Sequence, residues 1–316
     1  MISQIVSRSN ENVHAVDGID LTLEEGDIYG LVGESGSGKT TTGRLTTALA
    51  RPTEGSIKLN GTDIFRLSPK ELRRVRRGMQ YIFQDPMSSL NPKMKVGDAI
   101  LEPLRYLSNL SAVERRKTAD LMLEKVGLSP ASSFFERFPH ELSGGQRQRV
   151  VIARALVLAP AYVVADEPVA MVDVSVRTQI MDLLLVMQRE LDLTLLLITH
   201  DLAVAKYMCN KLAVMYLGKI VESGPSDEVF ARPQHPYTQA LLAAVPIPDP
   251  KARSEKKIPS GEIPSALHPP SGCRFHPRCP YAFERCSKEE PQLLSTGGEH
   301  FVACHLYPEK LKKQPP

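Results

Sequence analysis

Several features that mark particular protein classes are missing from this chain of 316 residues. No apolar stretch reaches the roughly 18 residues that a bilayer crossing needs, and the longest candidate, 150–165, is interrupted by Arg154 and Pro160. The first residues lack the basic start and apolar stretch of a secretory signal. No internal repeat and no long heptad run occurs, which excludes solenoid and coiled-coil architectures.

A surplus of one charge is also missing, because 39 basic and 36 acidic residues leave a net charge of +3. This balance gives no support for a broad nucleic-acid-binding surface, and we expect no nucleic-acid partner. The length suffices for one large domain plus a smaller one. We therefore expect a chain that stays in the cytoplasm, unless a membrane partner recruits it.

The strongest motif is a glycine-rich segment that reads G-x-x-x-x-G-K-T: Gly33-Glu34-Ser35-Gly36-Ser37-Gly38-Lys39-Thr40. The backbone N–H groups of such a loop wrap phosphates, and Lys39 reaches the β- and γ-phosphates. Thr40 supplies a hydroxyl to Mg²⁺, while the dipole of the following helix favours negative charge. The apolar run 28–32 predicts a strand, and 41–50 predicts a helix. We therefore predict nucleoside-triphosphate binding by these residues and Thr41.

A second half of this site is predicted where the apolar run 162–165 ends in Asp166 and Glu167. Asp166 can join the Mg²⁺ shell, often through water, and Glu167 can orient and polarise the attacking water. Such a pair is weak evidence by itself. It follows the phosphate loop by about 125 residues, as expected for this class of nucleotide hydrolase.

The most discriminating segment is Leu142-Ser143-Gly144-Gly145-Gln146. Ser143 can cap a helix predicted over 146–158, and the two glycines let a phosphate approach exposed N–H groups. Its position just ahead of the strand that ends at Asp166 resembles the signature segment of the ATP-binding cassette (ABC) family. The resemblance covers roughly residues 13–245.

The resemblance implies an α/β fold: a P-loop NTPase core with a mostly parallel sheet, and an α-helical subdomain at about 86–146 that carries the signature. Gln84 resembles the Q-loop glutamine, which joins the Mg²⁺ shell with Thr40 and Asp166 and senses the transmembrane partner. His200, after the apolar run 195–199, resembles the switch histidine that contacts the γ-phosphate. The implied catalytic residues are Glu167, His200 and Gln84.

In this family two subunits close head to tail on two ATP molecules, so Ser143, Gly144, Gly145 and Gln146 of one subunit would complete the phosphate site of the other. Asp173 would serve communication between them. The resemblance implies ATP and Mg²⁺ as cofactors. The implied partners are transmembrane permease subunits, a second ABC ATPase (a paralogue or another copy) and an extracytoplasmic solute-binding protein. The implied location is peripheral, at the cytoplasmic face of the membrane.

Three further segments resemble the dipeptide/oligopeptide importer branch: MSSLNP at 87–92, RPQHPYT at 232–238 and GCRFHPRCP at 272–280. We therefore expect an ATP-hydrolysing subunit that powers peptide uptake. Import of oligosaccharides or nickel, or a non-transport role, is the alternative.

Two departures from the family pattern concern the base and the subunit interface. Residues 1–27 contain no Phe, Tyr or Trp, where the family commonly places an aromatic ring against adenine. Either His14 stacks on the base, or the chain is shortened at its start. The loop after Glu167 reads Ala170-Met171-Val172-Asp173 in place of Ser-Ala-Leu-Asp, which retains only the aspartate.

The composition changes near residue 246, since 13 of the 25 prolines lie from Pro246 onward. We therefore expect an ATPase domain over 1–245 and, over 246–316, a proline-rich arm with a small extension.

This extension carries four cysteines spaced C-x5-C-x6-C-x17-C: Cys273, Cys279, Cys286 and Cys304. Cytosolic proteins rarely keep structural disulfides, so we expect a metal site. Four thiolates can hold a [4Fe–4S] cluster or tetrahedral Zn²⁺. The wide spacing, and a resemblance to cluster-bearing peptide-importer ATPases, favour the cluster over zinc and over free thiols. Cys209 is expected in the core.

Overall fold

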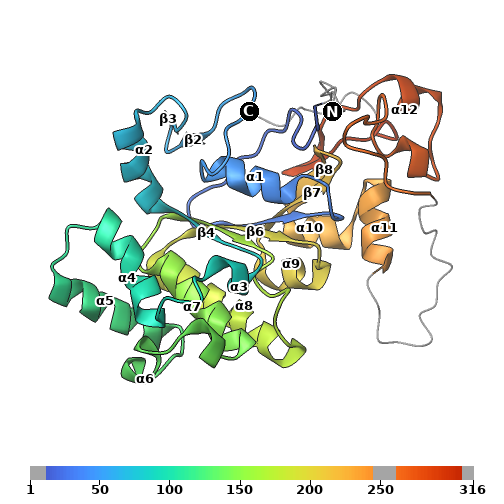
Figure 1. Cartoon of the computed structure of the whole chain (residues 1–316). Helices are drawn as coiled ribbons and strands as arrows, with labels where there is room; N and C mark the ends of the chain where they lie inside the picture. The colour runs from blue at the N-terminus through green and yellow to red at the C-terminus, as the bar shows by residue number, and fades with distance from the viewer. Residues whose placement is uncertain (1–11, 245–260, 308–316) are drawn as a thin grey trace, which may run out of the picture.

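The computed structural model describes residues 12–244 and 261–307, which are built on an eight-stranded sheet (Figure 1). The strand order is β4-β5-β6-β1-β7-β8-β10-β9, and the first five strands are parallel. This confirms the predicted mostly parallel α/β fold. The parallel strands are β4 (Met79–Ile82), β5 (Tyr162–Asp166), β6 (Thr194–Thr199), β1 (Ile28–Val32) and β7 (Lys211–Tyr216). The antiparallel strands are β8 (Lys219–Pro225), β10 (His300–Val302) and β9 (Leu294–Gly297).

The parallel strands are covered on both faces, which explains why they read as continuous apolar runs. Strands β1, β5 and β6 are buried along their whole length. One face carries α1 (Lys39–Thr46), α2 (Pro69–Val75) and the hairpin of β2 (Lys58–Leu59) and β3 (Thr62–Asp63) (Figure 1). The opposite face carries α3 (Pro86–Ser89), α7 (Gly144–Leu156), α8 (Val174–Leu191) and α9 (Leu202–Met208) (Figure 1).

A helical group lies at one end of the sheet, beside α7, and occupies most of the segment 86–146 (Figure 1). Its helices are α4 (Val96–Leu107), α5 (Ala112–Lys125) and α6 (Ala131–Phe135), and all three lie within the segment expected to be helical. Helices α4 and α6 meet closely at Gly97, where an added Cβ would lie 2.1 Å from the Phe135 ring. Among the described helices, none is both long and apolar enough to cross a membrane.

Local hydrogen bonds move two helix boundaries from their predicted positions. The helix predicted over 41–50 ends at Thr46, because Ala48 has φ 55° and the N–H groups of Leu49 and Ala50 both turn back to the Arg44 carbonyl. The helix predicted over 146–158 begins at Gly144. The Ser143 hydroxyl accepts from the Gln146 N–H, and the Gln146 side chain accepts from the Ser143 N–H.

The C-terminal extension joins the central sheet instead of forming a separate layer. Strand β10 pairs antiparallel with β8, with Val302 opposite Glu222. The fully buried Glu222 carboxylate accepts from the N–H groups of Gln234 (2.8 Å) and His235 (2.9 Å), and lies 2.7 Å from His300 Nε2. The expected boundary at 245/246 lies at the edge of the described residues. The remaining helices of this region are α10 (Ser226–Ala231), α11 (Pro236–Ala244) and α12 (Glu284–Lys288).

Acid should destabilise the fold through His235, because burial lowers its pKa to about 4. The unfolded side chain titrates near 6.5, so between these values only the unfolded chain binds the proton. Stability should be unaffected above pH 6.5 and should fall by about 2–3 kcal/mol as the pH drops to about 4.5. Urea unfolding across this range measures the slope. The variant His235→Asn keeps an acceptor for the Tyr237 N–H and should lose this part of the slope, whereas exposed His140→Asn should retain it. An unchanged slope in His235→Asn would contradict the assignment.

Candidate nucleotide site

The predicted site residues meet because three strands end at the same edge of the sheet. Parallel pairing places Val32 of β1 opposite Thr199 of β6, and Asp166 of β5 opposite Ile198 of β6. The phosphate loop, Glu167 and His200 each follow directly after one of these strands. Segments more than a hundred residues apart in the chain therefore share one site, where ligands of open α/β sheets bind.

The phosphate loop is bent by glycines that no other residue could replace at the same conformation. Gly33 has φ 153°, and an added Cβ would lie 2.1 Å from the Met215 carbonyl oxygen. Gly38 has φ 106°, and its Cβ would lie 2.0 Å from the Ala15 carbonyl oxygen. Both positions combine a left-handed backbone with contact to another main chain, so a side chain at either would displace the loop.

The Lys39 ammonium lies at the centre of this loop. It donates to the carbonyl oxygens of Gly33 (2.8 Å) and Glu34 (2.7 Å), and to Ser37 Oγ at 3.2 Å. Burial lowers its pKa, and the carboxylates of Glu167, Asp166 and Glu34 oppose that change. A buried cation with flexible donors at a helix start is suited to bind phosphate.

Asp166 is held by two hydroxyl groups, one of which sequence reasoning missed. Its Oδ1 accepts from Thr40 Oγ1 at 3.2 Å, and its Oδ2 accepts from Tyr81 Oη at 2.7 Å. Burial raises the pKa of Asp166, which a bound cation would reverse. Tyr81 belongs to β4, the strand beside β5, and stands three residues before Gln84. Only that proximity could have pointed to it.

The Glu167 carboxylate lies between the side chains of Gln84 and His200. Its Oε2 accepts from Gln84 Nε2 at 3.1 Å, and its Oε1 lies 2.7 Å from His200 Nδ1. Glu167 has φ 47°, and its N–H donates to the Ile198 carbonyl at 2.8 Å. The left-handed backbone therefore turns this carboxylate away from the strand and toward its two partners.

The signature segment packs against the first turn of α8, directly after Asp173. An added Cβ on Gly145 would lie 2.7 Å from Val176 Cγ1, and Asp173 stands at the start of α8. In the described part of the chain, no hydrogen bond joins Ser143 or Gln146 to the phosphate loop. Action on a second subunit therefore stays a prediction, as does the role of Asp173.

His14 lies near the end of the phosphate loop, because the carbonyl of the next residue, Ala15, faces Gly38. Its ring is half-exposed, with Nδ1 3.4 Å from Asp17 Oδ2. Stacking of this ring on adenine stays a prediction, and residues 1–11 lie outside the described chain.

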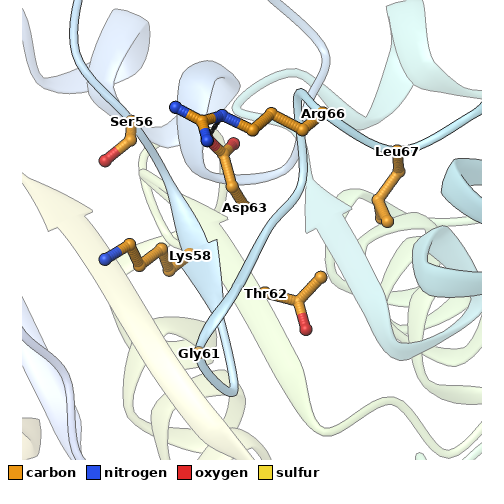
Figure 2. A pocket seen from close by; sticks show the side chains of 7 residues that line it. All are labelled: Ser56, Lys58, Gly61, Thr62, Asp63, Arg66 and Leu67. Atoms are coloured by element: carbon orange, nitrogen blue, oxygen red, sulfur yellow. Dashed lines mark ion pairs between the residues drawn. The ribbon is translucent and has the colours of Figure 1, made fainter.

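A separate surface pocket lies beside the β2–β3 hairpin, in the segment 56–67 (Figure 2). Asp63 and Arg66 form an ion pair of 3.2 Å at its edge, and the Lys58 side chain projects outward from β2 (Figure 2). None of its lining residues belongs to the predicted nucleotide site. The predicted phosphate-binding residues therefore lie apart from this pocket.

The four late cysteines lie near one another, and none of them forms a disulfide bond. Burial raises the pKa of Cys273 to about 12 and of Cys304 to about 11, and neighbouring thiols add to both shifts. The Cys273 N–H also donates to the Cys286 carbonyl at 2.8 Å. Yet among the described residues, no three His, Cys, Asp or Glu side chains are arranged as ligands of one metal ion. Cys209 is buried in the core as predicted.

The fold and the site geometry define a P-loop nucleotide hydrolase, and comparison with known proteins specifies its family. Residues 16–170 match the family model "ABC transporter", and residues 221–286 match "Oligopeptide/dipeptide transporter, C-terminal region". The chain belongs to the ABC transporter family of ATPases.

Several relatives are similar over nearly the whole chain. A putative peptide import ATP-binding protein of Brucella ovis is 50% identical over 289 residues, which cover 92% of this chain and 90% of that protein. The oligopeptide transport ATP-binding protein AppF of Bacillus subtilis is 45% identical over 308 residues, covering 96% and 93%. The dimeric ATP-binding cassette MJ0796, solved after hydrolysis with ADP and Pi, matches with a TM-score of 0.61 at 31% identity. That match covers 67% of this chain and 90% of that one.

Two substitutions should separate binding within a subunit from action across an interface. Lys39→Ala should weaken MgATP binding to the isolated chain, because the phosphates lose their charged partner. Ser143→Arg should leave that binding largely intact and block ATP-driven dimer formation, because it adds bulk and charge at the signature. Calorimetry measures the first effect and light scattering the second. Equal loss of ATP affinity in both variants would contradict a signature that acts in trans.

Proposed function

We propose that this ABC ATPase hydrolyses ATP to power the uptake of peptides through a membrane permease. The convergence of Lys39, Thr40, Asp166 and Glu167 at one edge of the parallel sheet carries the hydrolytic part. The match of 221–286 to the oligopeptide/dipeptide transporter C-terminal region, and the names of the relatives, support the peptide cargo.

The proposed mechanism assigns phosphate binding to the loop of residues 33–41 and Mg²⁺ binding to Thr40, Gln84 and Asp166. Glu167 then orients the water that attacks the γ-phosphate and accepts its proton. The contact of Glu167 Oε1 with His200 supports a pairing in which the ring positions this carboxylate and contacts the γ-phosphate.

We further propose that the protein works as a dimer of ATPases, of which the partner is a paralogue or another copy. Residues 143–146 of one subunit would then complete the phosphate site of the other, with Asp173 at the interface. Permease subunits, and a solute-binding protein outside the membrane, would complete the importer. In that assembly the chain would sit peripherally at the cytoplasmic face of the membrane.

For domain organisation we propose an ATPase domain over 1–245, a helical subdomain at about 86–146 within it, and an extension over 246–316. The helices α3 to α6 within 86–146 support the subdomain. The second family match runs from 221 to 286, so it covers most of β8 together with the first part of the extension.

Hydrolysis and uptake should both depend on Glu167. In the importer reconstituted in vesicles, Glu167→Gln should bind MgATP and lose about 10²–10⁴-fold in turnover, the range for an acid–base group. Peptide uptake should fall with it. Glu190→Gln, which changes an exposed carboxylate paired with Lys125, should leave both rates unchanged. Near-normal ATPase activity in Glu167→Gln would refute the assignment, and ATP hydrolysis without peptide uptake by the wild-type importer would refute the cargo.

We also propose that the four late cysteines ligate a structural [4Fe–4S] cluster, with Zn²⁺ as the alternative. The donor chemistry and the gathering of the four thiols support it. The absence of a ligand arrangement among the described residues counts against it.

Metal analysis of protein purified without oxygen tests this proposal. A cluster predicts a brown protein with iron, sulfide and absorption near roughly 400 nm. Replacing Cys273 with serine should release the iron and leave MgATP binding measurable, whereas Cys209→Ser should retain it. Stoichiometric zinc without iron would indicate a zinc site, and no metal at all would leave four free thiols.

A further inference from the structure

Two segments that the nucleotide chemistry leaves unexplained, 232–238 and 272–280, meet at one residue of the phosphate loop. The Glu34 N–H donates to Tyr237 Oη at 2.8 Å. The Glu34 carboxylate accepts from both terminal nitrogens of Arg278, at 2.8 and 3.2 Å. This bidentate ion pair between guanidinium and carboxylate fixes the relative orientation of the two groups as well as their distance. The main chain and the side chain of Glu34 are thus both held by residues more than 200 positions later.

Arg278 is itself held in place by an aromatic cluster of Tyr216, Tyr237 and Phe275. Its guanidinium carbon lies 5.9 Å from the ring centres of Tyr216 and Phe275, and its side chain is only 9% exposed. Phe275 is buried and packs against Tyr216 and Tyr237 at centroid distances of 5.3 and 5.4 Å. Aromatic rings at these distances are closely packed, so none of them can move without displacing its neighbours.

The segment that carries Cys273 and Cys279 positions Arg278 against this aromatic cluster. Arg278 ends a short 3₁₀ turn, η3 (His276–Arg278), between Cys273 and Cys279. The Arg278 N–H donates to the Phe275 carbonyl at 3.0 Å, and the His276 N–H donates to the Cys273 carbonyl at 2.9 Å. The extension therefore presents its arginine to the phosphate loop from a locally hydrogen-bonded support.

The position of Glu34 matters because its carbonyl is also one of the acceptors of Lys39 Nζ. The residue thus connects the extension to the lysine that we assign to the phosphates. A loop that is already held in its binding conformation loses little conformational entropy when ATP binds. The affinity for ATP is therefore higher than for a flexible loop.

We propose that Arg278 and Tyr237 are positioning residues of the nucleotide site, which hold Glu34 and thereby the phosphate loop in its ATP-binding conformation. This inference rests on the proposed function, since it assigns a cause to the affinity of that same site. The C-terminal extension accordingly contributes to ATP binding in addition to joining the sheet.

The test is equilibrium binding of MgATP to the full-length chain. Arg278→Gln should weaken binding about tenfold, as expected for loss of a charge-assisted hydrogen bond. Arg278→Lys, which keeps the charge without the fork, should recover part of it. Lys288→Ala removes a cation that pairs with Glu284 inside α12, and should bind as the wild type does.

A double-mutant cycle with Glu34→Gln separates positioning from a general structural role. Glu34→Gln should cause a loss similar to that of Arg278→Gln, and the double variant should bind no more weakly than either single variant. Urea unfolding without nucleotide should show that the folded populations are equal. Additive losses, or full ATP affinity in folded Arg278→Gln, would overturn the proposal.

Two further outcomes keep the test decisive. If Arg278→Gln does not fold, Tyr237→Phe removes only the hydroxyl that accepts from the Glu34 N–H, and Glu34→Gln changes only one partly buried carboxylate. Unchanged affinity in both would overturn the proposal. Wild-type protein that does not bind MgATP would refute the proposed function itself, whereas wild-type binding with unaffected variants refutes only the positioning role.

Discussion

The nucleotide site depends on the register of three parallel strands. Pairing of Val32 with Thr199, and of Asp166 with Ile198, makes β1, β5 and β6 end side by side. Because parallel strands present their carboxyl ends at a common edge, the loop, the carboxylate and the histidine that follow them share one region. A shift of one residue would turn each side chain to the other face and separate Asp166 from Thr40.

Buried charge accounts for the chemistry of that edge. Burial lowers the pKa of Lys39 and raises that of Asp166, so each charged form relies on its neighbours. Carbonyl groups of the loop hold the ammonium, and the hydroxyls of Thr40 and Tyr81 hold the carboxylate. Phosphate and a divalent cation would supply the charges that these two groups lack. The site is therefore electrostatically prepared for a metal–nucleotide complex.

The C-terminal extension is tied to the cassette at two places of different character. At β10, the buried Glu222 carboxylate accepts hydrogen bonds from two N–H groups and contacts the His300 ring. This contact joins the extension to the sheet. At Arg278, the extension reaches the phosphate loop through Glu34. The first contact anchors the extension to the sheet. Through the second contact, the position of the extension affects the conformation of the phosphate loop.

The sequence by itself determined what is encoded within a few residues. The buried strands at 28–32, 162–166 and 194–199, the cap at Ser143 and the bends at Gly33 and Gly38 follow from local pattern and backbone sterics. Only the tertiary structure decided contacts between distant segments: the hydroxyl of Tyr81 on Asp166, the extension strand in the sheet, and Arg278 on Glu34. Such pairs lie 78 to 244 residues apart and leave no periodic signal, because sheet order and side-chain packing bring them together.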